Sequence, residues 1–472
     1  MQSVHDLVVL GTGSGGEVAA GELARAGSRV AAVDEARVGG ECPYVACVPS
    51  KALLLAAREH VLVGGDHAQA YASAVRRRDE AAAERDDSGA AQGLRDDGVE
   101  VVRGRGVLSG RAGDDLVVTV TAADGTEQRL VARAVVLGTG SGPVVPPIDG
   151  LGDVPTWTSD QALSSPELPA RLAILGGGAV GCELAQVYAS FGSEVVLVEA
   201  GPTLLGNEPA WVGERIADAL RELGVDVRVG TRVAAAEPDG AGLRLQLEDG
   251  DGGARGTVAA DRLLLAGGRR PRSADLGLGT LGVSPADDGS LATDARCRVL
   301  GPDGEPVPGL HAVGDVTAVS PYTHTATYQG RIVAAHLLGH GRDADYTAIP
   351  SAVYTDPAVY SVGESADTAR ARGADVLVEG IELSDTGRGF IAGAGGRLEL
   401  VADAADGRLL GATAVGPDAD SWAGELGLAV RAGLGVRLLA DHVHGFPTWG
   451  EAVQPVATAL VARLDEPGTA HG

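Results

Sequence analysis

Two parts of the chain repeat the same pattern of apolar and polar positions. Residues 7–10 and residues 172–175 are apolar runs of strand length, and each leads into a glycine-rich turn, an amphipathic helical pattern and a second apolar run. The offset between the two copies stays constant up to the acidic residues that end them, Asp34 and Glu199. Each copy therefore predicts a βαβ unit of the kind that opens a dinucleotide-binding fold.

The glycines of both copies stand where a dinucleotide requires them. The first lets the chain leave the strand tightly, the second lets the pyrophosphate approach the backbone, and the third lets the helix pack against the strand. The free N–H groups and the positive dipole end of the helix attract the phosphates, and the final acidic residue can accept hydrogen bonds from a ribose diol. These residues are Gly11, Gly13, Gly16 and Asp34 in the first copy, and Gly176, Gly178, Gly181 and Glu199 in the second.

Outside the two copies, the pattern predicts other elements. Residues 50–100 are rich in alanine and charge and predict helices, with the three arginines at 76–78 expected on a solvated helix face. Residues 101–135 and 225–266 alternate apolar and polar positions between turns, as antiparallel strands do. From about residue 346, strands are followed by helices. The predicted fold class is α/β, with two Rossmann-like dinucleotide-binding domains and a C-terminal α+β domain.

The charge of the chain restricts its partners. The 472 residues carry a formal net charge of −26, which repels nucleic acid phosphates and anionic membrane surfaces. No apolar run is long enough to span a bilayer and no secretory signal is visible, so we expect a cytoplasmic location and no membrane partner. Four cysteines do not indicate a structural disulfide framework in such a protein. Any disulfide is therefore expected to be catalytic or regulatory.

A pair of cysteines follows the first βαβ unit directly. Residues 39–51 read GGECPYVACVPSK, in which Cys42 and Cys47 can bridge if the chain between them loops. Pro49 suits the first turn of a helix, so Cys47 is expected just before a helix N-terminus, where the dipole lowers the pKa of a thiol. A metal site is the alternative, but no second pair of ligands accompanies these cysteines, and no metal is predicted. The remaining cysteines, expected to be buried in apolar surroundings, are Cys182 and Cys297.

Motifs in a fixed order along almost the whole chain resemble a known family. They are the cysteine segment, LGTGS at 137–141, the second glycine motif, AGGRRP at 266–271, GLHAVGD at 309–315 and YTDP at 354–357. They resemble the class I pyridine nucleotide–disulfide oxidoreductases, the family of dihydrolipoamide dehydrogenase, glutathione reductase and mercuric reductase. The resemblance implies a homodimeric FAD enzyme with an FAD-binding domain in two parts (1–147 and 269–345), an NAD-binding domain (148–268) and a dimerisation domain (346–472).

The resemblance also implies roles for the matching residues. Cys47 is implied to be the thiol next to the flavin, and Cys42 the interchange thiol that meets the acceptor. Lys51 and Glu183 are implied to pair beside flavin N5. Lys51 is the only lysine of the chain, in which every other Lys or Arg position is arginine, and a role beside N5 would explain why this position keeps a lysine. The further residues implied to bind FAD are Thr139, Gly140, Gly314 and Asp315, the last of them at the ribityl chain. Arg269 is also implied to bind a cofactor.

The acidic residue of the second copy predicts the nicotinamide cofactor. A carboxylate at Glu199 would repel the 2′-phosphate of NADP(H), and no arginine follows between residues 200 and 213 to bind one. We therefore expect NAD(H) as the electron donor.

The C-terminal motif departs from the family pattern His-Pro-Thr-x-x-Glu. Phe446 occupies the histidine position, and Glu451 keeps that of the orienting carboxylate. Because phenylalanine transfers no proton, general acid–base help of typically about 10²–10⁴-fold is expected to be missing there. His444 either substitutes as the base or is a structural histidine. Tyr44, Phe446 and Trp449 form either an aromatic substrate mouth or part of the dimer interface.

These inferences predict an NADH-dependent flavoenzyme that passes electrons through FAD to the Cys42–Cys47 pair and on to a small acceptor, which the sequence does not identify. One alternative is a quinone or small-electrophile reductase, or a secondary-metabolism dehydrogenase, in which the disulfide is vestigial. Another is a non-catalytic redox-sensing or scaffold subunit that uses FAD structurally.

Overall fold

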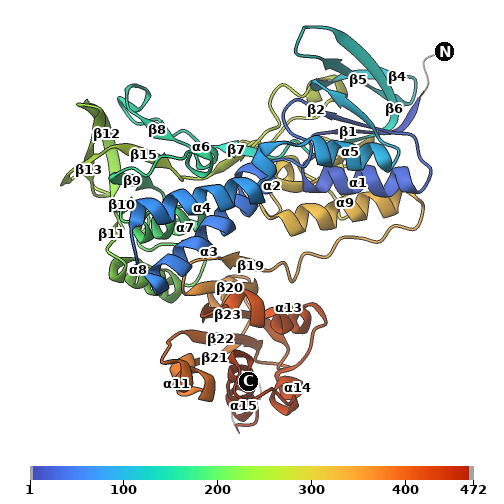
Figure 1. Ribbon diagram of the computed structural model, residues 1–472. Helices are drawn as coiled ribbons and strands as arrows, with labels where there is room; N and C mark the ends of the chain where they lie inside the picture. Colours follow the sequence, from blue (N-terminus) through green and yellow to red (C-terminus); the bar gives the residue numbers. More distant parts are fainter. Residues whose placement is uncertain (1–3, 467–472) are drawn as a thin grey trace.

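The first sheet combines strands from two distant parts of the sequence. In the computed structural model, which describes residues 4–466, it has the order β17-β18-β6-β1-β2-β3, with β5 paired antiparallel to β6 and β4 paired antiparallel to β5 (Figure 1). The parallel core is in register, with Leu7 of β1 opposite Val30 of β2 and Ala134 of β6. The strands are β1 (His5–Leu10), β2 (Val30–Asp34), β3 (Glu100–Arg103), β4 (Arg105–Ala112), β5 (Asp115–Thr121), β6 (Glu127–Leu137), β17 (Arg298–Leu300) and β18 (Pro306–Ala312).

Helices from both ends of this region pack against one another beside the sheet. Helices α1 (Ser14–Arg25) and α9 (Thr323–Leu337) lie side by side, as Figure 1 shows, and α5 (Ser88–Asp96) lies near α1. The close approach of α1 and α9 requires glycine, because a Cβ on Gly330 would lie 2.4 Å from the carbonyl oxygen of Gly15. The region is thus discontinuous in sequence but has a continuous core.

The second sheet is entirely parallel and has the order β11-β10-β9-β15-β8. A separate antiparallel sheet of β12, β13 and β14 packs beside it. The strands are β8 (Thr156–Trp157), β9 (Arg171–Leu175), β10 (Glu194–Val198), β11 (Asp226–Arg228), β12 (Arg232–Asp239), β13 (Gly242–Glu248), β14 (Ala254–Ala260) and β15 (Arg262–Leu265), and the helices are α6 (Ser159–Ser164), α7 (Ala179–Ser190) and α8 (Ala210–Glu222).

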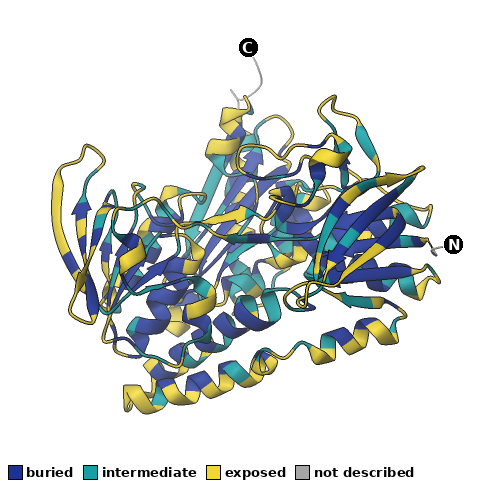
Figure 2. Cartoon of the chain, turned by 90° about the horizontal axis from the view of Figure 1, so that it is seen from above, coloured by how far each residue is buried: buried dark blue, intermediate teal, exposed yellow. Residues whose placement is uncertain are grey.

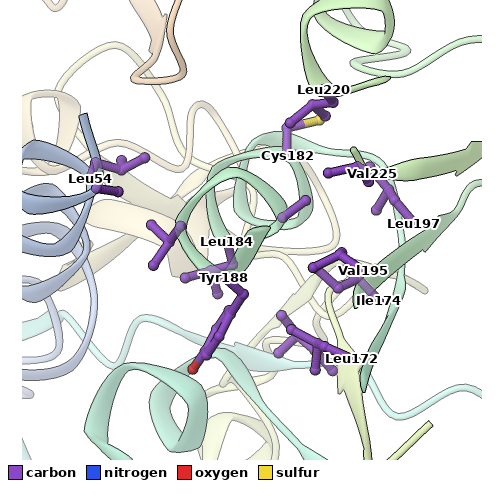
Figure 3. Packing of buried hydrophobic residues seen from close by; sticks show 14 of the residues in the cluster. Leu54, Leu172, Ile174, Cys182, Leu184, Tyr188, Val195, Leu197, Leu220 and Val225 are labelled. Atoms are coloured by element: carbon purple, nitrogen blue, oxygen red, sulfur yellow. The ribbon is translucent and has the colours of Figure 1, made fainter. Parts of the chain in front are cut away.

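Helix α7 is at the centre of the largest apolar cluster. Tyr188 of α7 points toward α6 and donates a hydrogen bond from its hydroxyl to the carbonyl of Ala162 at 3.0 Å, while Cys182 on another face of the helix contacts the side of α8 (Figure 3). Leu54 belongs to α3 (Cys47–Val63), which comes from the first region and packs against α7. The cluster therefore joins the two nucleotide-binding regions. The other elements of this segment are α2 (Cys42–Val45) and α4 (His67–Ala81).

The C-terminal region is an antiparallel sheet with the order β19-β20-β23-β22-β21 and covering helices. It forms the lower part of the molecule in the view of Figure 1. Its strands are β19 (Ser351–Val353), β20 (Ala358–Gly363), β21 (Val376–Glu382), β22 (Arg397–Asp403) and β23 (Leu409–Gly416), and its helices are α10 (Ala366–Ala371), α11 (Gly387–Ala392), α12 (Ala419–Trp422), α13 (Gly424–Arg431), α14 (Val436–Asp441) and α15 (Val453–Leu464).

This architecture confirms the predicted fold class of two Rossmann-like regions and a C-terminal α+β region. Strands at the sheet centres are buried, whereas the outer faces of many helices are exposed (Figure 2). The expectation of a fully solvated arginine run is wrong for Arg78, whose side chain is 1% exposed and donates to the carbonyl of Ser165 at 2.7 Å. Among the helices of residues 4–466, none has the length and apolarity that a membrane crossing requires.

Candidate active site

The first glycine turn leaves room for a pyrophosphate. Gly11 has a φ of 89°, and a Cβ there would lie 2.4 Å from the carbonyl oxygen of Gly138. A Cβ on Gly16 would lie 2.2 Å from the carbonyl oxygen of Gly11, so the helix reaches the strand only with glycine. At Gly13 the nearest atom to an added Cβ is 4.0 Å away, and no side chain caps the N-terminus of α1. These features fit the phosphates of a dinucleotide such as FAD.

The second glycine turn has the same geometry. Gly176 has a φ of 111°, and a Cβ on Gly181 would lie 1.9 Å from its carbonyl oxygen. A Cβ on Gly178 would meet no atom within 4 Å, and no side chain caps α7. The turn therefore fits a second dinucleotide.

The acidic residues at the two strand ends stabilise the glycine turns, because their carboxylates accept hydrogen bonds from backbone N–H groups of the turns. Asp34 accepts from the N–H of Thr12 at 2.8 Å, and Glu199 accepts from the N–H of the equivalent Gly177 at 2.7 Å. Asp34 also accepts from the hydroxyl of Thr12, at 2.7 Å. Each carboxylate oxygen has two lone pairs, so both residues keep acceptor capacity for a ribose diol.

A polar network joins the other residues expected at FAD. Asp315, in the 3₁₀ turn Gly314–Thr317 after β18, accepts a hydrogen bond from the hydroxyl of Ser141 at 2.6 Å. Arg269 donates from Nε to the same hydroxyl at 2.8 Å, and strands β7 (Ser141–Pro143) and β16 (Arg269–Pro271) pair there. Nearby, the carbonyl of Gly140 accepts from the N–H of Arg272 at 2.9 Å. Residues that are distant in sequence thus converge where the two regions connect.

Two neighbours of this network were not assigned from the sequence. Glu41 forms an ion pair with Arg269 and a second one with Arg272, at 2.7 Å. Gln329 of α9 accepts from the N–H of Gly314 at 2.6 Å, and Thr139 donates to the carbonyl of Arg272 at 2.6 Å. These contacts involve side chains far apart in sequence, for which no local motif gives a signal.

The cysteine pair begins two consecutive helices. Cys42 is the first residue of α2 and Cys47 the first of α3, and both thiols are half-buried. The hydrogen bond from Cys42, supported by the hydroxyl of Thr323 and the charge of Lys51, lowers the pKa of Cys47 to about 6. The same hydrogen bond, followed by burial, raises the pKa of Cys42. The reduced pair therefore consists of a thiolate at Cys47 and a thiol at Cys42 near neutral pH.

The two remaining cysteines have no such environment. Both are fully buried, as expected. Burial raises the pKa of Cys182 and raises that of Cys297 to about 11, so both stay protonated at neutral pH.

The single lysine is held by an ion pair with α7. Lys51 Nζ lies 2.8 Å from Glu183 Oε2, and the Glu183 side chain is only 7% exposed. The other oxygen of Glu183 accepts from the backbone N–H of Tyr354 at 3.1 Å, and the ring of Tyr354 lies 4.4 Å from Lys51 Nζ. The expected Lys51–Glu183 pair is thus present, and no local pattern in the sequence indicates that Tyr354 also contacts it.

The residues of the C-terminal motif lie within the C-terminal region, apart from the cysteine pair of the same subunit. His444 Nε2 is 3.2 Å from Glu425 Oε1, Glu451 accepts from the N–H of Arg388 at 2.8 Å, and Phe446 is 77% exposed. In the described part of the chain, their polar and ring contacts all lie within the C-terminal region. Within one subunit the structure therefore does not bring them to the cysteine pair.

The aromatic mouth expected from the sequence does not include Tyr44. Its side chain is 5% exposed, and its hydroxyl donates to the carbonyl of Val38 at 3.1 Å. Tyr44 packs inside the first region because α2 turns it away from solvent, whereas Phe446 lies exposed in the C-terminal region.

Comparisons with known proteins agree with this arrangement. Residues 5–330 match the family model of pyridine nucleotide-disulphide oxidoreductases, and residues 349–457 match the dimerisation domain of the same family. A dihydrolipoyl dehydrogenase of Thermus scotoductus is 35% identical over 97% of both chains, and a mercuric reductase of Acidithiobacillus ferrooxidans is 32% identical over 97% of this chain and 82% of its own. The Cu(II) complex of the HOCl-induced flavoprotein disulfide reductase RclA from Escherichia coli superposes with a TM-score of 0.83 at 27% identity, covering 97% of this chain and 100% of that one. The chain therefore belongs to the pyridine nucleotide-disulphide oxidoreductase family, as an FAD-dependent enzyme that couples NAD(P)H to a redox-active disulfide.

Proposed function

We propose that the enzyme takes its electrons from NADH, works as a homodimer and reduces a small-molecule acceptor at the Cys42–Cys47 pair. The observation that carries the proposal is the opposite shift of the two thiol pKa values, down at Cys47 and up at Cys42. Two electrons and one proton convert the disulfide into this thiolate and thiol. Bound FAD supplies the two-electron chemistry that links the nicotinamide to the disulfide.

The residues divide the work according to their environments. Cys47, beside Lys51 and Thr323, keeps the negative charge. Cys42 keeps the proton in the reduced pair. To attack an acceptor, Cys42 loses this proton and becomes the thiolate through which thiol–disulfide exchange proceeds. Lys51, fixed by Glu183, supplies a positive charge at the reduced centre.

The remaining site residues follow from the two glycine turns and the polar network. FAD would be held in residues 1–147 and 269–345, and NAD(H) in residues 148–268. The proposed FAD ligands are Gly11, Gly13, Gly16, Asp34, Thr139, Gly140, Arg269, Gly314 and Asp315, and the proposed NAD(H) ligands are Gly176, Gly178, Gly181 and Glu199.

The preference for NADH over NADPH rests on Glu199. Its carboxylate is fixed by the N–H groups of Gly177 and Gly201, at 2.7 and 2.5 Å. Held there, the charge would repel a 2′-phosphate.

A homodimer would bring the C-terminal region (346–472) of one subunit to the cysteine pair of the other. Phe446 provides no proton there, and the side chain of His444, the candidate base, is only 6% exposed. These two observations favour acceptors that need little proton transfer from the protein. They also favour the second candidate, a quinone or small-electrophile reductase with a vestigial disulfide.

A non-catalytic subunit is not supported, because the family consists of enzymes. A cytoplasmic location stays a prediction.

An anaerobic titration of the FAD-loaded enzyme with NADH tests the disulfide step. After two electrons, a long-wavelength absorbance band from the Cys47 thiolate beside the flavin is expected. Cys47→Ser should lose the band, and Cys42→Ser should show it before any reduction, because Cys47 can then form no disulfide. NADPH should reduce the enzyme more slowly than NADH.

The matched control is Cys297→Ala, which removes a buried cysteine that is not part of the pair and should titrate like the wild type. A wild-type enzyme that bleaches fully without the band would overturn the disulfide step. Turnover of quinones or metal ions that is equal in Cys42→Ser and in the wild type would establish the second candidate.

A further inference from the structure

Two histidines and a glutamate meet in the C-terminal region, apart from the cysteine pair of the same subunit. Glu425 lies in the first turn of α13, and His442 and His444 follow α14. One ligand atom from each of the three side chains lies within 4.8 Å of the others. The two imidazole rings are 4.7 Å apart, centroid to centroid, and nearly perpendicular.

The environment of His444 is unusual for a structural histidine. Its side chain is only 6% exposed, yet neither ring nitrogen has a hydrogen-bond partner in the described part of the chain. The carboxylate of Glu425 lies 3.2 Å from Nε2, but not in the geometry of a hydrogen bond. Buried ring nitrogens are almost always paired, so this orphaned imidazole points to a missing ligand.

We propose that Glu425, His442 and His444 form a binding site for a divalent transition-metal ion. Two imidazoles and one carboxylate are a ligand set that suits Zn²⁺, Cu²⁺ or Ni²⁺, whereas Mg²⁺ and Ca²⁺ prefer oxygen ligands alone. Three protein ligands leave a coordination position open. All three ligands line a surface pocket, together with Trp422, Thr448 and Trp449.

The ion would tie the segment after α14 to α13. This segment continues to Phe446 and to the 3₁₀ turn Trp449–Ala452, which carries Glu451. A bound ion would therefore fix the backbone that presents the altered family motif. The inference does not depend on the identity of the electron acceptor.

Isothermal titration of the oxidised, FAD-loaded enzyme with Zn²⁺ tests the site. The closed disulfide keeps the thiols from competing, and Cys42→Ser/Cys47→Ser checks this independently. We expect one Zn²⁺ per subunit, unaffected by excess Mg²⁺ or by the double serine variant. His442→Ala and Glu425→Gln should each weaken binding about tenfold or more.

The matched control is His340→Ala, which removes an exposed histidine elsewhere and should bind Zn²⁺ like the wild type. Because His442 is exposed, its alanine variant is expected to fold, and the thermal unfolding temperature gives a second measurement. Zn²⁺ should raise the Tm of the wild type but not of His442→Ala. Absence of saturable binding to the wild type, or unchanged binding by His442→Ala, would overturn the proposal.

Discussion

The hydroxyl of Thr323 supports the charge of a cysteine that lies 276 residues earlier in the chain. Thr323 begins α9, and its Oγ1 is 3.5 Å from Cys47 Sγ. A hydroxyl can donate to the thiolate but gains little from the neutral thiol, so it favours the charged form. Together with Cys42 and Lys51, it lowers the pKa of Cys47 to about 6.

Thr323→Ala should raise the pKa of Cys47. In the two-electron-reduced wild type, the thiolate band should be lost as the pH falls through about 6. The variant should lose it at a pH higher by about one to two units, since a hydrogen bond to a charged group is worth roughly 1.5–3 kcal/mol. The measurement is a pH titration of the band. Thr327→Ala, one turn further along α9, is the control, and identical titrations of the two variants would contradict the assigned role.

At the scale of elements, the glycines of the second glycine turn have different roles: one is required by the packing of the helix, and another leaves space for a ligand. Gly181 is required by the fold, because a Cβ there would lie 1.9 Å from the carbonyl oxygen of Gly176. Gly178 has φ −75° and ψ −173°, which any residue adopts, and its Cβ would meet nothing within 4 Å. The space beside Gly178 is therefore available to a ligand.

Gly178→Val should impair NADH binding without impairing folding. The added side chain would occupy the space of the pyrophosphate, and the loss of its hydrogen bonds should raise the KM for NADH about tenfold or more. The Tm and the flavin content should stay close to those of the wild type. Gly181→Ala should instead lower stability by about 1–3 kcal/mol through overpacking. Steady-state kinetics and thermal unfolding distinguish the two, and an unchanged KM in Gly178→Val would contradict the assignment.

The sequence predicts most of what is local in this structure. The glycine turns, the acidic strand ends and the start of α3 at Cys47 depend on short-range patterns, which recur in the sequence with fixed spacing. The burial of Arg78 and Tyr44 depends on partners far along the chain, such as the carbonyl of Ser165. The ion pairs of Glu41 with Arg269 and Arg272 are equally non-local. Hydrophobic periodicity carries no information about such contacts.

At the scale of the whole molecule, Glu183 connects three regions. It lies on α7 of the second region, pairs with Lys51 from the first, and accepts the N–H of Tyr354 at the start of the third. One turn later on the same helix, Gln186 accepts the N–H of Asp356 at 2.7 Å. The ion pair proposed to serve the redox centre is therefore also a structural junction.

Glu183→Gln should affect both catalysis and stability. It keeps the shape of the side chain but leaves Lys51 without its counter-charge. We expect flavin reduction by NADH to slow about tenfold and stability to fall by roughly 1.5–3 kcal/mol. Stopped-flow absorbance and thermal unfolding measure the two effects. Glu194→Gln, an exposed change in the same region, should alter neither, and wild-type behaviour of Glu183→Gln in both would remove the junction from the mechanism.

Helix α7 is 12 residues long, begins at the second glycine turn, and carries both of these anchors on its flank. A short helix moves as a rigid rod, so any tilt produced at its first turn displaces the ammonium group of Lys51 and the chain at 354–356 together. A nucleotide that shifted this turn would therefore also shift the junction of the three regions, which lies within two helical turns of it.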